Sequence, residues 1–210
     1  MSARSKPGPR ERLLRSTREL TYSQGVAVPL DAILEDAGVA RRSLYHHFGG
    51  KAELIAEALR VSADDDIQRY QAALQSGGED PRQRVLAVFD ALEATTESER
   101  FHGCRYTAAE LSLTDPDHPA HVETRAYKDR LHTLFTSELH ALGHPSAERA
   151  ADQLLLLIDG VLVGAVTRPE AHPAKAAREM AEGVLDADTT ASGAVRQDGA
   201  LDFAADSDLS

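Results

Sequence analysis

The apolar residues of this chain recur every three or four positions along almost its whole length, a spacing typical of amphipathic α-helices. In the first such segment Leu13 and Leu20 share one face, and Arg15 lies on the opposite one. No run of the sequence keeps the strict alternation of apolar and polar residues that predicts a half-buried strand. The pattern therefore predicts an all-α fold.

Glycine and proline mark where these helices begin and end, because glycine favours helix C-termini and proline is tolerated in the first turn. Gly25 and Gly38 each follow a predicted helix, Asp80-Pro81 opens another, and Ser146 is expected to cap a third. The predicted helices cover residues 10–24, 29–37, 41–48, 51–75, 120–142, 146–168 and 171–185, with a further helix from residue 81, a less regular piece at 101–113 and a loop at 114–119.

The helices group into three parts along the chain. We expect a small three-helix domain over residues 1–50 and a larger helical domain over residues 51–186. Residues 187–210 are rich in aspartate and small side chains and poor in large apolar ones. Such a segment cannot bury enough apolar surface to order itself, so we expect a disordered acidic tail.

Composition and charge narrow the classes of function. The chain has 210 residues, 42% of them hydrophobic, and a formal net charge of −11. It is therefore long enough for a buried core and too acidic to coat a polyanion or an anionic membrane with its whole surface. The first 60 residues nevertheless carry ten Lys/Arg against seven Asp/Glu, a net charge of +3, and the other 150 carry −14. This asymmetry predicts that the N-terminal part binds a polyanion.

The cysteine count and the length of the apolar segments indicate a reducing, aqueous compartment. Cys104 is the single cysteine, so no disulfide can close within the chain. The most apolar stretch, residues 154–166, is shorter than the roughly 20 residues needed to span a bilayer. No apolar run of the kind found in signal peptides follows residues 1–10. We expect a cytoplasmic protein with no membrane partner and no cofactor.

A helix, a tight glycine turn and a second helix are predicted between residues 29 and 48. Apolar residues at helical spacing would lock the two helices at a fixed angle. These residues are Ile33, Ala37, Gly38, Val39, Leu44 and Phe48. The polar side of the second helix would then enter a DNA major groove with Arg41, Arg42, Ser43, Tyr45 and His46. Lys51, at the start of the next helix, adds a cation where the helix dipole already favours a phosphate.

Residues 36–55 resemble the signature of the TetR family of transcriptional regulators. Three features coincide: the Leu-Tyr-x-His-Phe core over residues 44–48, Lys51 three positions after Phe48, and an amphipathic helix upstream. The resemblance covers roughly the first 60 residues, and the helical remainder fits the general plan of the family. It implies a ligand-responsive regulator, most simply a repressor, that binds a palindromic double-stranded DNA operator as a homodimer.

The resemblance also implies a role for each polar residue of the motif. Arg41, Arg42, Ser43 and His46 would lie in or near the groove, and Tyr45, His47 and Lys51 would favour the phosphate backbone. The family commonly has threonine at the position of Val28, where its hydroxyl caps the second helix and touches a phosphate. Val28 can do neither, although Pro29 offsets part of the lost capping by presetting the first helical turn.

One helix-turn-helix touches few base pairs, so useful specificity needs two copies on an inverted repeat. Regulatory domains of the family dimerise through their last two main helices. Here the helix over residues 146–168 is apolar nearly all round, which a domain of this size seldom encloses. The predicted dimer interface consists of Leu154, Leu155, Ile158, Leu162, Val166, Ala177, Met180, Ala181 and Val184.

Proteins that resemble this family usually carry a ligand pocket among their middle helices. Ligand binding changes the distance between the two DNA-binding domains of the dimer. Aromatic and sulfur side chains of the middle segment are the candidates for its wall, and the effector itself is unknown. The candidates are Phe89, Phe101, His102, Cys104, Tyr106, Tyr127 and Phe135.

Two other classes of function stay open at this stage. A metal sensor would gather His102, Cys104, His118 and His121, although these residues lie on separate pieces of the chain. A helical interaction protein would use the basic N-terminal part only as a solvated face. An enzyme is not expected, because the sequence contains no phosphate-binding glycine loop, nucleophile elbow or other catalytic signature.

Overall fold

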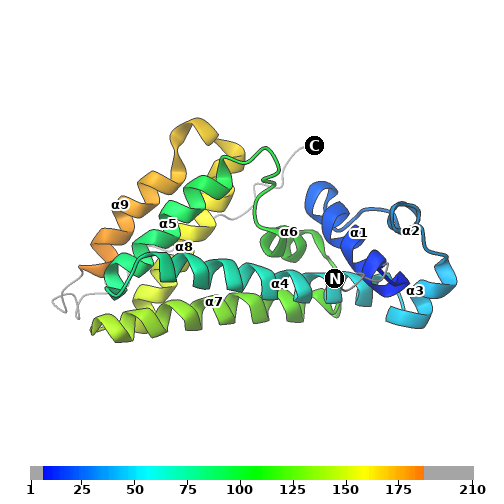
Figure 1. Ribbon diagram of the computed structural model, residues 1–210, viewed down its shortest axis with the longest axis horizontal. Coiled ribbons are helices and arrows are strands. Elements are labelled where there is room, and N and C mark those ends of the chain that lie inside the picture. Colours follow the sequence, from blue (N-terminus) through cyan, green and yellow to red (C-terminus); the bar gives the residue numbers. More distant parts are fainter. Residues whose placement is uncertain (1–6, 187–210) are drawn as a thin grey trace, which may run out of the picture.

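The computed structural model describes residues 7–186, and all regular structure in that range is helical (Figure 1). The elements are α1 (Pro9–Gln24), α2 (Leu30–Ala37), α3 (Arg41–Phe48), α4 (Lys51–Ser76), α5 (Pro81–Thr96), α6 (Arg105–Ser112), α7 (Ala120–Leu142), α8 (Ala147–Thr167), the short 3-10 helix η1 (Pro169–Ala171) and α9 (Pro173–Leu185). The predicted all-α fold is confirmed. The expected acidic tail lies outside the described residues.

Most predicted helix boundaries agree with the structure because the local capping signals act as expected. Gly38 and Gly143 end α2 and α7 in the left-handed conformation, with φ of 58° and 75°. Asp80 caps α5 by accepting a hydrogen bond from the backbone N–H of Arg82 at 3.0 Å. The prediction for Ser146 is wrong in one respect: it occupies the N-cap position of α8, but its side chain makes no capping hydrogen bond.

Two separate cores divide the helices. The smaller core joins α1, α2 and α3 around Leu13, Ile33 and Leu44, whose side chains are fully buried. Leu54 and Ala58, from the first eight residues of α4, also belong to it. The larger core takes the rest of α4 together with α5 to α9. The helix α4 is therefore shared by both cores.

The larger body is a bundle of long helices. Helices α4 and α7 lie side by side, and α5, α8 and α9 stack across their far end (Figure 1). The three-helix unit α1–α3 sits at the opposite end of α4, and α6 lies between the two bodies (Figure 1). The molecule is therefore elongated, with the two ends connected through α4.

The helix α8 is longer than the apolar segment recognised in the sequence. By length and composition alone its 21 residues are enough to cross a membrane, which corrects the argument from residues 154–166. The helix packs on α7, α5 and α9 instead. Asp159, the acidic residue within this apolar run, accepts a charge-assisted hydrogen bond from Lys128 of α7.

Candidate functional site

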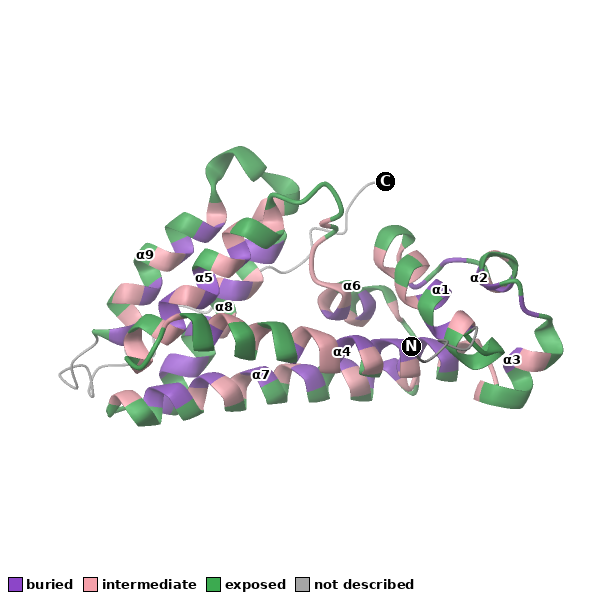
Figure 2. Ribbon diagram, viewed as in Figure 1, coloured by how far each residue is buried: buried purple, intermediate pink, exposed green. Residues whose placement is uncertain are grey.

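The helix α3 presents its polar side chains to the surface and one leucine to the interior. Leu44 has no exposed surface, so it fixes the rotation of the helix in the smaller core. Figure 2 shows that much of α3 is exposed. Its exposed residues are Arg41, Arg42, Tyr45, His46 and His47, and Ser43 is partly buried. The structure thus brings all six predicted residues of α3 to one exposed or half-exposed helical surface.

The turn before α3 is held in place by a residue of α1. The guanidinium of Arg12 donates to the carbonyl oxygens of Ala37 and Gly38 at 2.9 and 3.0 Å. These carbonyls lie at the C-terminus of α2, where a positive charge is favourable. The backbone N–H of Val39 also donates to the carbonyl of Leu34 at 3.0 Å. The angle between α2 and α3 is therefore fixed by backbone geometry as well as by packing.

The two arginines at the start of α3 differ in their surroundings. Arg41 forms an ion pair with Asp31 of α2, and both side chains are at least half exposed. Within residues 7–186 Arg42 forms no ion pair, so its guanidinium is available to another partner. Tyr45 is 53% exposed. An exposed guanidinium and phenol on one helix can bind guanine edges and phosphate oxygens.

The N-terminus of α4 lies directly after α3 and offers a second anion site. Gly50 occupies the N-cap position, and no side chain caps the first backbone N–H groups of the helix. Lys51, partly buried, follows at the first helical position. A phosphate held there would meet both the lysine and the positive end of the helix dipole.

The start of α2 differs from the expectation. The helix begins at Leu30, so Pro29 is its N-cap residue and not its first helical residue. Val28 is only 3% exposed and packs in the smaller core, which gives it a structural role in place of the threonine expected from the family.

Several basic residues of the N-terminal part hold the fold together. Arg18 donates to Ser62 at 2.9 Å and pairs with Asp65 of α4. Arg10 pairs with Glu57 of α4 at 2.6 Å. Together with Arg12 at the turn, these residues connect α1 to its neighbours. The positive balance of this part of the sequence is therefore not all available to a polyanion.

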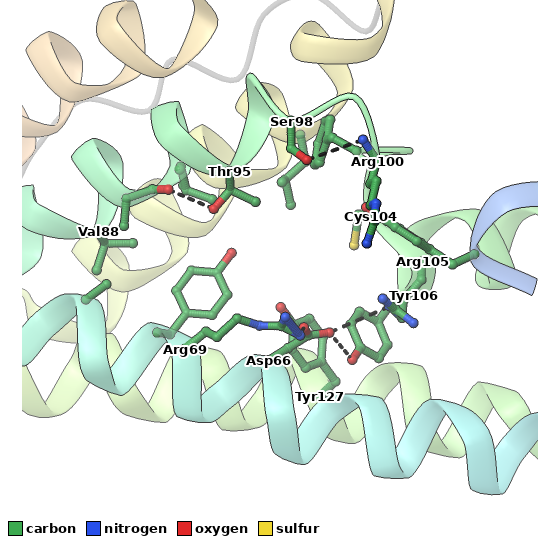
Figure 3. Close-up of a pocket in the computed structure, with 18 residues that line it drawn as sticks. Asp66, Arg69, Val88, Thr95, Ser98, Arg100, Cys104, Arg105, Tyr106 and Tyr127 are labelled. Carbon is green, nitrogen blue, oxygen red and sulfur yellow. Dashed lines mark hydrogen bonds and ion pairs between the residues drawn. The ribbon is translucent and has the colours of Figure 1, made fainter. Parts of the chain in front are cut away.

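A cavity of about 330 Å³ lies among the middle helices (Figure 3). Of the predicted wall residues, Phe101, Cys104, Tyr106 and Tyr127 line it. The prediction is wrong for Phe89 and Phe135, which are 1% and 0% exposed and lie within the larger core instead. His102 does not line the cavity either; its backbone N–H donates to the hydroxyl of Tyr22 at 3.1 Å.

The polar centre of the cavity was missed by the sequence analysis. Asp66 of α4 accepts a hydrogen bond from the hydroxyl of Tyr106 at 2.6 Å and pairs with Arg69 and Arg105 (Figure 3). Burial raises the pKa of Tyr106, which keeps it a neutral donor to the carboxylate. Tyr106 stacks on Tyr127 with ring centroids 3.7 Å apart.

The histidines proposed as metal ligands do not converge. Both ring nitrogens of His121 have partners: Nδ1 bonds to Glu110 at 2.9 Å and Nε2 to the carbonyl oxygen of Asp115 at 3.0 Å. In the part of the chain that the structure describes, no group of three His, Cys, Asp or Glu side chains is arranged to hold a metal ion. The geometry gives no support to the metal-sensor alternative.

Comparison with known proteins agrees with this geometry. Residues 13–58 match the model of the bacterial regulatory proteins of the tetR family, and residues 107–187 match the tetracyclin repressor-like C-terminal domain. A solved TetR-family transcriptional regulator from Streptomyces coelicolor is 28% identical, with a TM-score of 0.77 over 86% of this chain and 90% of that one. A TetR transcriptional regulator from Streptomyces avermitilis is 31% identical, with a TM-score of 0.67 over 84% and 99% of the two chains.

A curated relative extends the match over nearly the whole protein. The HTH-type transcriptional regulator YjdC of Escherichia coli is 26% identical over 178 residues, which are 84% of this chain and 93% of the relative. This chain belongs to the TetR family. It is a helix-turn-helix transcriptional regulator, and the exposed helix α3 lies within the residues that match the tetR-family model.

The predicted dimer surface of this TetR-family chain needs correction. Leu154, Ile158, Leu162, Ala177 and Ala181 are at most 8% exposed in the single subunit and point into its own core. Leu155 and Val184 are partly buried, and Val166 and Met180 are exposed. Two further apolar residues of α8, Leu156 and Val163, are 71% and 52% exposed and were not among the predicted interface residues.

The two stripes of α8 follow from helical geometry. Leu154, Ile158 and Val161 recur at intervals of four and three and face inward, whereas Leu156 and Val163 lie seven residues apart on the outer face. Figure 2 shows exposed surface along the outer sides of the α5–α8–α9 end. An apolar outer stripe on a helix of a TetR-family regulator is suited to contact with another apolar surface.

Proposed function

We propose that this chain is a ligand-responsive transcriptional repressor that binds a palindromic DNA operator as a homodimer. The observation that carries the proposal is the orientation of α3, whose single buried side chain, Leu44, leaves Arg42 and Tyr45 exposed beside one another. In this proposal the protein binds DNA and catalyses no reaction. Because it would bind chromosomal DNA, it would work in the cytoplasm. Residues 1–50 would form the DNA-binding domain, and residues 51–186 would form the regulatory and dimerisation domain.

The assignment of individual contacts is the one that the family resemblance implies, and the exposure of Arg42, Tyr45 and His46 is consistent with it. Arg42, Ser43 and His46 would reach base edges, and Tyr45, His47 and Lys51 would bind phosphates. Arg41 would join the groove contacts after leaving Asp31, because an exposed ion pair is weak and easily exchanged.

The outer stripe of α8 supports assembly as a dimer. Leu156, Val163, Val166 and Met180 are all more than half exposed and lie on α8 and α9. A soluble protein rarely leaves such an apolar strip in contact with water, and a twofold axis would cover it with the same strip of a second copy. The cavity around Asp66 supports ligand response, since its volume suits a small molecule.

The test begins with selection of duplexes from a random library by the full-length protein. We expect an inverted repeat that binds at least about a thousandfold more tightly than a scrambled duplex at physiological salt. Destroying one half-site should remove most of this preference, and transcription in vitro from a promoter that overlaps the repeat should fall when the protein is added. Selection of no repeat, or equal affinity for the scrambled duplex, would contradict the proposal.

A further inference from the structure

Two hollows of the structure meet at the same three side chains. The first is the cavity around Asp66, and the second is an open groove between α1 and α4. Tyr22, Arg69 and Arg105 line both. A molecule that reaches this side of the cavity would therefore touch Tyr22 of α1, the first helix of the DNA-binding unit, and two arginines that face it.

The cavity carries a positive charge within an acidic domain. Its wall includes three arginines, Arg69, Arg100 and Arg105, against one carboxylate, Asp66. The groove is also positive, with Arg15, Arg18 and the two shared arginines against two carboxylates, Glu19 and Asp65. Since residues beyond 60 carry a net charge of −14, the local excess of arginine is opposite to the charge of the domain that contains it.

The single carboxylate of the cavity is already occupied. The Oδ1 atom of Asp66 accepts from Arg69, and Oδ2 accepts from Tyr106 at 2.6 Å with the Nε atom of Arg105 at 3.8 Å. A cationic ligand would have to displace these partners before it could use the carboxylate. An anionic ligand has no such competitor.

Arg105 is short of hydrogen-bond partners. Its side chain is only 18% exposed, and within residues 7–186 its one side-chain hydrogen bond is from Nη1 to the hydroxyl of Ser62 at 3.2 Å. The contact with Asp66 at 3.8 Å is longer than a hydrogen bond. A guanidinium has five N–H donors, so most of them are available to an acceptor placed in the cavity.

The remaining wall of the cavity favours a flat apolar body. Tyr106 and Tyr127 stack almost parallel, with an interplanar angle of 16°, and both contribute to the cavity wall. Val88, Leu92 and Leu162 line the cavity from α5 and α8. Such a wall suits a planar ring that stacks on tyrosine while a charged group reaches the arginines.

We propose that the effector is a small planar anion, such as an aromatic carboxylate, and that it acts by drawing Arg105 away from Tyr22. This inference rests on the proposed function. The guanidinium carbon of Arg105 lies 4.2 Å from the ring centroid of Tyr22, a cation–π contact that ties α6 to the end of α1. A ligand carboxylate would bind the same guanidinium through two charge-assisted hydrogen bonds, which are stronger than a cation–π contact and would pull the guanidinium toward the ligand. The DNA-binding unit would then lose one of its attachments to α6.

Binding of matched ligands tests the charge preference without DNA. Cinnamate, cinnamamide and cinnamylamine share one planar frame and differ in charge, and calorimetric titration of the full-length protein compares them. We expect cinnamate to bind at least about tenfold more tightly than the amide, because a charge-assisted hydrogen bond is the stronger one. Arg105→Gln should reduce this ratio to about twofold or less, and Arg149→Gln, an exposed arginine of α8, should preserve it.

Two results would overturn the ligand assignment. They are equal binding of the three compounds and tightest binding of the amine. If Arg105→Gln does not fold, as judged by circular dichroism, the mostly exposed Arg69 replaces it, and Arg69→Gln should lower the cinnamate preference at least about threefold.

Substitution of Tyr22 tests the transmission step. Saturating cinnamate should weaken binding of the selected duplex at least about fivefold in the natural protein. Tyr22→Phe and Tyr22→Leu both lose the hydrogen bond from His102, so they differ only in the ring. Tyr22→Phe should respond like the natural protein, whereas Tyr22→Leu should respond less than about twofold. An unchanged response of Tyr22→Leu would overturn this step. Failure of the unliganded protein to bind any selected duplex would count against the proposed function alone, because the ligand titrations contain no DNA.

Discussion

Arg12 of α1 donates from its guanidinium to the backbone carbonyl oxygen of Gly38, 26 residues further along the chain, at 3.0 Å. The same Nη1 atom bonds the carbonyl of Ala37. A charged side chain of the first helix thus closes the C-terminus of the second, directly before the helix that we propose reads DNA. Gly38 itself has φ of 58°, and a Cβ there would lie 3.3 Å from this Nη1 atom.

Removal of this contact should loosen the turn. Arg12→Ala is expected to lower the free energy of unfolding by about 1–3 kcal/mol, because a part-buried carbonyl and an exposed one both lose a charged donor. Gly38→Ala should cost about 1–2 kcal/mol through the left-handed backbone alone. Urea unfolding followed by circular dichroism measures both. Arg15→Ala, an exposed neighbour on α1, should change stability by less than about 0.5 kcal/mol, and an equal loss there would contradict the argument.

Substitutions on α3 and α4 should separate base reading from phosphate binding. Arg42→Ala is expected to cost about 1–3 kcal/mol on the selected duplex and to relax the preference at the contacted base pair. Tyr45→Phe and Lys51→Ala should weaken binding to all duplexes alike, and Lys51→Ala should also reduce the salt slope by about 1. Fluorescence anisotropy on matched and mismatched duplexes gives these values. Uniform losses for Arg42→Ala would remove it from base reading.

Introduction of a charge on the outer stripe of α8 should separate the subunits. Leu156→Glu is expected to raise the dimer dissociation constant at least about a hundredfold, since an unpartnered carboxylate would be buried at the twofold axis. Light scattering after gel filtration would report the change. Val122→Glu, on the 68% exposed site of α7, serves as the control and should stay dimeric. A dimeric Leu156→Glu protein would place the interface elsewhere.

The pair Glu110 and His121 should give stability a defined pH dependence. Hydrogen bonds from Thr124 and His121 lower the pKa of Glu110 to about 2, and the hydrogen bond to Glu110 raises the pKa of His121 above 6.5. Glu110 therefore stabilises the fold above its ordinary pKa of 4.5, and this contribution is lost as the pH falls toward 2. His121 stabilises below its ordinary pKa of 6.5, and its contribution is lost as the pH rises through the raised value.

The two contributions overlap between pH 4.5 and 6.5. Glu110→Gln should lose the most stability relative to the natural protein in this window, and the difference should narrow on both sides of it. Thermal unfolding at a series of pH values measures the effect. Glu179→Gln, an exposed carboxylate of α9, should show a flat difference, and a flat difference for Glu110→Gln would contradict the assignment.

The sequence predicted the helices because their signals are local. Apolar spacing and a terminal glycine are read from a few neighbouring residues, so α3 and α7 match the predicted bounds. The motif around Leu44 was equally accessible, since its turn and its buried positions lie within one short segment. The exposure of the α3 side chains followed from the same periodicity.

The pocket and the interface depend on distant neighbours and were predicted less well. Leu154 and Leu156 look alike in sequence, and only the positions of α7 and α9 decide which one is buried. Aspartate is usually found at the surface. No residue near Asp66 in the sequence indicates that it bonds to Tyr106, which is 40 residues away. One signal was available: Asp64, Asp65 and Asp66 are consecutive, and three successive residues of a helix spread over about 200°, so they cannot all lie at the centre of the solvent-exposed face.

The sharing of α4 between the two cores has a mechanical consequence. At about 1.5 Å per residue, its 26 residues make a stiff lever about 39 Å long. A tilt of about 5° at the ligand end would carry the other end about 3.4 Å, which is the rise of one base pair. A small displacement of one side chain in the regulatory domain can in this way shift α3 by about one base pair relative to its half-site in the DNA, and neither core has to unfold.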